Sequence, residues 1–113
     1  MSTDVQKTEQ EIASMEQRIK IGQAIERLNS NSDFQLVIVK GFLQDDCLRY
    51  LDLSGDSTVS EKARLDSLNI AQAGGHFKRY IEAQMTKARD AANRINDQKN
   101  FLDQLRAEEI SQE

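Results

Sequence analysis

The chain has no proline and only five glycines among its 113 residues. The residues that most often interrupt helices and form tight turns are therefore scarce, which argues against an all-β or loop-rich fold. One cysteine and one histidine cannot supply an intrachain disulfide or a Cys/His zinc site. The chain also contains neither of the glycine motifs that bind phosphate, GxxxxGK[ST] and GxGxxG. We therefore expect helices, with no cofactor and no metal.

Long apolar runs are also missing. The longest aliphatic run, Leu36 to Val39, is far too short to cross a membrane, and the N-terminal residues lack the basic and apolar blocks of a signal peptide. Hydrophobic residues make up 38% of the chain, charged residues 30%, and the net charge is -4. We expect neither a membrane span nor secretion by a signal peptide, and only a limited buried core.

Near both ends of the chain, apolar residues recur every seven positions. They are Val5, Ile12 and Ile19 near the N-terminus, and Ile81, Ala88, Ile95 and Leu102 near the C-terminus. This spacing predicts long helices over about 3–28 and 58–108 that pack antiparallel along a narrow seam. The seam residues that we expect are Ile12, Met15, Ile19, Ala88, Ile95, Leu102 and Leu105. Because small residues in this seam bury little area, we expect further copies or a larger partner to cover the remaining apolar edge.

Between these arms lies the densest apolar segment, Phe34 to Phe42. The turn formers of 29–33 end the first arm, and Asn31 or Ser32 can cap the next helix. The segment suits either a strand or a helix, and we favour a helix because no partner strand is available. Gly41 can end that helix or kink it.

The central segment, about 33–53, is expected to form an apolar hub with the start of the C-terminal arm. Its members are Phe34, Val37, Ile38, Phe42, Leu48, Leu51, Leu65, Leu68, Phe77 and Ile81. The prediction is one all-α domain over 1–113, an elongated antiparallel helical hairpin with a short central helix or helix pair.

Few residues suggest catalysis. His76 has no orienting acid and no nucleophile in a recognisable pattern, and Cys47 beside Leu48 suits a buried position better than a reactive one. Asp45 and Asp46 are adjacent and diverge on a helix. The pair Gly74–Gly75 suits a close helix contact or a kink better than a phosphate site. We therefore predict that the protein is not an enzyme.

One local basic bias occurs between His76 and Arg94, where the formal charge is +3. Its basic residues are Lys78, Arg79, Lys87, Arg89 and Arg94. They form a possible interaction face for an acidic partner protein, or a solvated face. Binding to nucleic acid is the less favoured interpretation, because Glu82 and Asp90 dilute the positive field.

Four segments, 24–29, 31–34, 37–43 and 47–51, resemble a pattern in small helical proteins of tailed bacteriophages. They read Ala24-Ile-Glu-Arg-Leu-Asn29, Asn31-Ser-Asp-Phe34, Val37-Ile-Val-Lys-Gly-Phe-Leu43 and Cys47-Leu-Arg-Tyr-Leu51. The resemblance implies a non-enzymatic structural or assembly role, in which multiple copies bind a head, connector or scaffold-associated virion protein. It places the protein in the virion or the host cytoplasm. The alternatives are a helical inhibitor or adaptor of a host protein and, second, a nucleic-acid-binding helical protein.

Overall fold

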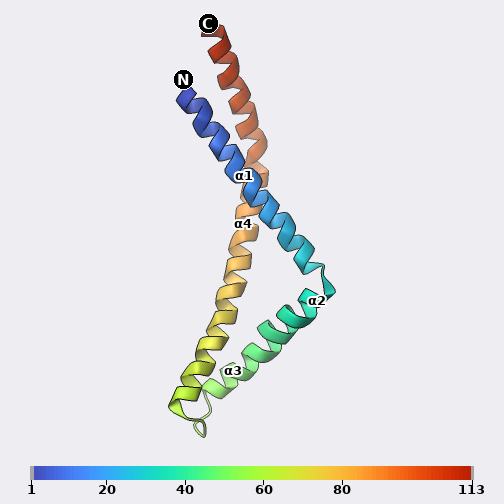
Figure 1. The fold of residues 1–113 in the computed structure, drawn as a ribbon, viewed down its shortest axis with the longest axis vertical. Helices are drawn as coiled ribbons and strands as arrows, with labels where there is room; N and C mark the ends of the chain where they lie inside the picture. Colours follow the sequence, from blue (N-terminus) through green and yellow to red (C-terminus); the bar gives the residue numbers. More distant parts are fainter. Residues whose placement is uncertain (1, 113) are drawn as a thin grey trace. The chain divides into compact units, whose positions relative to one another are not determined.

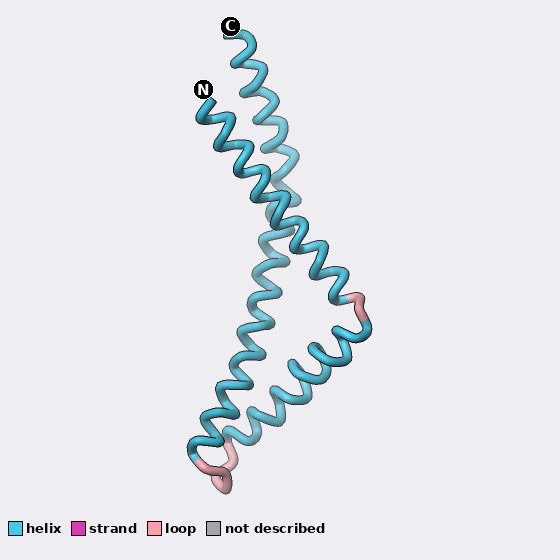
Figure 2. Tube along the Cα trace, in the orientation of Figure 1, coloured by secondary structure: helices cyan, strands magenta, loops and turns pink. Residues whose placement is uncertain are grey.

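The structure is a computed structural model that describes residues 2–112, and all of its regular elements are helical. The elements are α1 (Ser2–Asn29), α2 (Ser32–Phe34), the π-helix η1 (Gln35–Asp46), α3 (Cys47–Ser54) and α4 (Glu61–Gln112). Within this range, only residues 30–31 and 55–60 lie outside helices (Figure 2). The predicted all-α fold, with long N- and C-terminal helices and short central ones, is confirmed.

The chain divides into two compact units, which we describe separately. Unit 1 consists of Met1–Ala24 and Ala83–Glu113, and unit 2 of Ile25–Glu82. The single domain over 1–113 that the sequence predicts stays a prediction.

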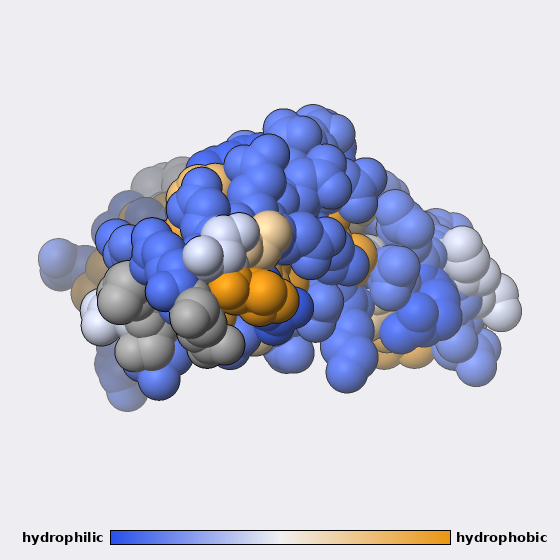
Figure 3. Space-filling view, turned by 90° about the horizontal axis from the view of Figure 1, so that it is seen from above, coloured by the Kyte–Doolittle hydropathy of each residue, from blue (hydrophilic) through white to orange (hydrophobic). Residues whose placement is uncertain are grey.

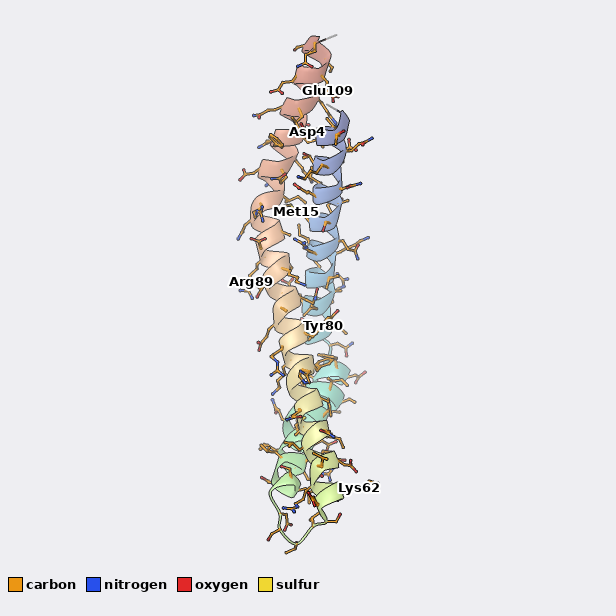
Figure 4. The ribbon with its side chains drawn as sticks, turned by 90° about the vertical axis from the view of Figure 1, so that its left-hand side faces the viewer. Asp4, Met15, Lys62, Tyr80, Arg89 and Glu109 are labelled. Carbon is orange, nitrogen blue, oxygen red and sulfur yellow. The ribbon has the colours of Figure 1, made fainter. Side chains whose placement is uncertain are left out.

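Unit 1 is an antiparallel pair of helices, formed by α1 and the C-terminal part of α4, with the two terminal ends lying together (Figure 1). Ile12, Met15, Ala91, Ile95 and Leu102 form its buried core, and Val5 and Ile19 pack against them. Met15 points from α1 toward α4, as Figure 4 shows. The seven-residue stripes therefore meet each other, as expected for helices that each bury one narrow row.

Three contacts set the register of this pair. Arg106 donates to Glu9 at 2.9 Å, and Lys99 lies 3.9 Å from Glu16. Gly22 lies so close to Ala88 that a Cβ on the glycine would overlap the Ala88 side chain. A shift by one heptad would place Ile95 opposite Gly22, or Met15 opposite Ala88, and neither side chain fits so close an approach. Because exposed ion pairs contribute little, the small residues are the stronger determinant of register.

We expect Gly22→Ala to destabilise unit 1, although alanine is favoured over glycine in a helix by about 1 kcal/mol. The new methyl group must displace Ala88, and overpacking of this kind typically costs about 1–3 kcal/mol. Combining it with Ala88→Gly should relieve the overlap. Urea unfolding followed by circular dichroism measures all four chains of the double-mutant cycle. Additive effects, within about 0.5 kcal/mol, would show that the two residues do not contact each other.

In unit 2, side chains cap the helix ends. The Asn31 side chain accepts from the Phe34 N–H at 2.9 Å, so Asn31 is the cap among the two candidates that the sequence left open, and Gly55 follows the last residue of α3. The C-terminal arm, which the sequence predicts from about residue 58, begins as α4 at Glu61, with Ser60 Oγ accepting from the Ala63 N–H.

Thr58 instead belongs to the loop before α4. It donates through its hydroxyl and its backbone N–H to Asp56, at 2.7 and 2.9 Å. These hydrogen bonds, the hydroxyl's first, lower the pKa of the Asp56 carboxyl. Thr58 is therefore engaged in ordering the loop and does not cap the helix.

Segment η1 has a wider winding than the α-helix expected from the sequence. At its end, the Cys47 N–H donates to the carbonyl of Phe42, five residues back, as well as to that of Gln44. Phe34, Val39 and Leu43, spaced five and four apart, line one groove in this winding. Val37, one of the expected hub residues, does not line this groove and is 62% exposed.

The hub prediction needs a further correction, because several of its members are exposed. They are Val37, Leu48, Leu51 and Leu65. The other members are only half-buried: Phe34, Ile38, Phe42, Leu68, Phe77 and Ile81. The large buried side chains of unit 2 are those of Ile25 and Leu43. A contact one helix wide covers one row of each helix and leaves the flanking apolar residues in solvent.

Candidate protein-binding surfaces

Unit 2 contains an open groove with a largely apolar lining. Its volume is about 150 Å³, well below the roughly 300–1,000 Å³ of typical small-molecule sites. The groove is lined by Asn29, Phe34, Val39, Leu43, Phe77, Lys78, Ile81 and Glu82. Its apolar floor with a polar edge suits one apolar side chain of a partner better than a metabolite.

Close packing of α4 against the central helices forms this part of unit 2. A Cβ on Gly74 would overlap Cys47 Sγ and would lie 3.7 Å from Leu43 Cδ2. Helix α4 passes through Gly74–Gly75 without interruption. The glycine pair therefore supports a close helix contact, one of the two alternatives that the sequence left open, and it does not end the helix.

Most of the large apolar side chains that are exposed among residues 3–112 belong to unit 2. Eight of these ten residues belong to unit 2: Leu28, Leu36, Val37, Leu48, Leu51, Leu65, Ile70 and Tyr80. By contrast, hydrophilic side chains cover most of the face seen in Figure 3, where hydrophobic residues form small patches. Leu48 and Leu51 lie three residues apart on α3 and therefore share one face of that helix, which makes them the candidate contact with another protein.

The residues considered for catalysis do not come together. His76 Nδ1 lies 2.9 Å from the Arg79 guanidinium, one turn away on α4. Asp46 pairs with Arg49 at 3.6 Å, Asp45 is exposed, and Cys47 packs against Gly74. In the part of the chain that the structure describes, no cluster of three or more His, Cys, Asp or Glu side chains could hold a metal ion.

The five basic residues of the possible interaction face all lie on α4 and are exposed. They are Lys78, Arg79, Lys87, Arg89 and Arg94. Arg89 projects from the side of α4 away from α1 (Figure 4), and Arg94 pairs with Asp90 at 3.4 Å. Their use as a binding face stays a prediction.

Sequence reasoning missed the groove because it assumed α-helical spacing for 35–46. Val39 and Leu43 are therefore not among the expected hub residues. The sequence does carry a signal, since residues 37–39 and 42–43 are all apolar and can present an apolar row in either winding. Gly41 is also compatible with the wider winding, where a Cβ would lie 3.1 Å from the Leu36 carbonyl oxygen.

Comparison of the chain with protein families, curated proteins and solved structures found no match. Among residues 2–112, no helix has both the length and the apolar composition that a membrane span requires. Function is therefore argued from the surfaces described above.

Proposed function

We propose that this is a non-enzymatic structural or assembly protein of a tailed bacteriophage, which binds in multiple copies to a larger virion protein. The apolar residues that unit 2 exposes would form the contact. The phage assignment depends on the sequence resemblance at 24–51, and the binding role on the surface of unit 2.

The exposed leucines are the observation that carries the binding role. Leu48 and Leu51 of α3 are 61% and 51% exposed, although unit 2 buries few large side chains of its own. Burying a leucine side chain completely contributes about 1.5–3 kcal/mol. A partner that covers these leucines would therefore gain binding free energy of this size. A helical partner with its own apolar row would cover them.

The partners of the residues considered for catalysis favour a binding role, because His76 contacts Arg79 and Asp46 pairs with Arg49. An enzyme site needs a nucleophile or base, an orienting group and a cavity that holds the substrate. Here the groove has room for about one side chain.

The test is a Leu48→Ser/Leu51→Ser double variant, with Ile110→Ser as its control. Ile110 is 72% exposed and belongs to unit 1, so its change removes an exposed apolar residue from the other unit. We expect the double variant to bind phage particles roughly 10- to 100-fold more weakly, since each tenfold corresponds to about 1.4 kcal/mol. The control should bind like the unchanged chain.

Quantitative mass spectrometry of purified particles gives the copy number, and co-sedimentation gives the affinity. A chain that is absent from particles and binds no virion protein would contradict the proposal. Stoichiometric capture of a host enzyme instead would favour the inhibitor or adaptor alternative.

A further inference from the structure

The charges of unit 1 are divided between its two ends. Residues 2–16 and 97–112, which contain the ion pairs of Glu9 and Glu16, carry eight acidic and three basic side chains. Residues 17–24 and 83–96 carry five basic side chains and one acidic side chain, Asp90. The half that contains the chain ends is therefore acidic by five charges, and the other half is basic by four.

A continuous exposed row runs along α4 across both halves. Its members recur every three or four positions, which places them on one face of the helix. They are Lys87, Asp90, Arg94, Asp97, Phe101, Gln104 and Glu108, and all are exposed. Phe101 is 47% exposed, and no other member of the row is apolar. The row thus combines an aromatic ring with charges of opposite sign toward its two ends.

We propose that unit 1 binds unit 1 of a second copy of this chain, with the two α4 rows antiparallel and related by a two-fold axis. In that arrangement the acidic half of each copy faces the basic half of the other. When Arg94 faces Phe101 of the second copy, Lys87 faces Glu108 of the second copy. Each contact occurs twice because the interface is isologous. A parallel arrangement would instead bring like charges together.

Two of these contacts are well matched, Arg94 with Phe101 and Lys87 with Glu108. At the two-fold axis, however, Asp97 meets Asp97 of the second copy, and this like-charge contact opposes association. A guanidinium over an aromatic face contributes about 0.5–2 kcal/mol, depending on how far it is desolvated. The Phe101 ring also becomes covered, which removes the large exposed apolar side chain of this row from solvent. Charge complementarity then selects the antiparallel orientation over the parallel one.

The contact area of the two rows is small. At 1.5 Å per residue, the row from Lys87 to Glu108 is about 32 Å long, and one helix is about 10 Å wide. The row therefore covers about 320 Å² on each copy, below the roughly 800 Å² per partner of standard interfaces, so we expect a weak dimer that depends on charge.

The dimer gives one way in which multiple copies associate. It rests on the proposed function only for the presence of several copies. The self-contact lies on unit 1, whereas the partner surface lies on unit 2. A chain that dimerises but binds no virion protein would refute only the proposed function. A monomeric chain that binds particles would refute only the self-contact.

Sedimentation of the full chain against salt provides the first test. We expect a dimer at 50 mM salt and at least tenfold weaker association at 1 M, where the Debye length falls to about 3 Å. Phe101→Ala should weaken the dimer at least tenfold without loss of helix content. Leu48→Ser/Leu51→Ser should leave the dimer unchanged. Association that is insensitive to salt, or lost in the leucine variant, would overturn the proposal.

Charge reversal provides the decisive test. One variant carries Asp97→Lys and Glu108→Lys, and a second carries Lys87→Glu and Arg94→Glu. Each should be monomeric alone, because its row has one sign of charge at both ends. An equimolar mixture should form a heterodimer, since the two rows again complement each other. Self-association of either variant alone, or a mixture that stays monomeric while both chains retain their helix content, would overturn the proposal.

Discussion

Ile95→Ala should lower the free energy of unfolding of unit 1 by about 2–5 kcal/mol, the usual cost of removing a large aliphatic side chain from a core. Ile95 is 9% exposed and belongs to a core of five residues. A two-helix contact has no second layer that could close around the cavity. The loss should therefore be a large fraction of the stability of this unit.

Ile110→Ala is the matched control, because it makes the same chemical change on the same helix at a residue that is 72% exposed. It should change the free energy of unfolding by no more than about 0.5 kcal/mol. Urea unfolding followed by circular dichroism gives the total change. Hydrogen exchange of 3–24 and 83–112 shows whether the change is confined to unit 1. Equal effects of the two substitutions would contradict the assignment of the core.

Gly74→Ala and Gly75→Ala should change the stability of unit 2 in opposite directions. Both replace glycine inside α4, and both gain about 1 kcal/mol from helix propensity. At Gly75 the new methyl group would meet only the end of the Arg79 side chain, at 3.5 Å, so the gain should be realised. At Gly74 it would overlap Cys47 Sγ, and overpacking costs about 1–3 kcal/mol. Thermal unfolding of the two variants gives the sign of each effect.

Cys47→Ala tests the cause of the Gly74 effect. Without the sulfur, a methyl group at position 74 would lie 3.7 Å from Leu43 Cδ2, an ordinary van der Waals distance. Gly74→Ala should then become neutral or stabilising in the Cys47→Ala background. If Gly74→Ala is as destabilising in this background as in the unchanged chain, the contact between positions 74 and 47 is not the cause of the destabilisation.

The helices and the unit 1 seam could be predicted from the sequence because both depend on local spacing. Ile12 and Ile19 are seven residues apart, as are Ile95 and Leu102, and no proline interrupts the helices on which they lie. Asn31 could be identified as one of two candidate caps, with Ser32, because a cap bonds only a few residues along the chain. Interactions of this range leave a direct pattern in the sequence.

The groove and the exposed leucines could not be predicted in this way. Val37, Val39 and Leu43 are all apolar, and which of them faces α4 depends on the winding of η1. Leu48 and Leu51 have the spacing of buried residues, but unit 2 has no further element to cover them. Apolar spacing shows that one face of a helix favours burial. It does not show whether another segment of the same chain or a different protein packs against that face.

The sequence by itself determined that this protein is helical, that its two ends bear matching apolar stripes, and that residues 29–33 separate two helices. These properties follow from backbone propensity and from repeats within a few turns. Only the tertiary structure decided the register of unit 1, the π winding of η1 and the exposure of the unit 2 leucines. The reason is steric: the contacts of Gly22 with Ala88 and of Gly74 with Cys47 join residues far apart in the chain. Such close packing selects one arrangement among several that satisfy the same hydrophobic pattern.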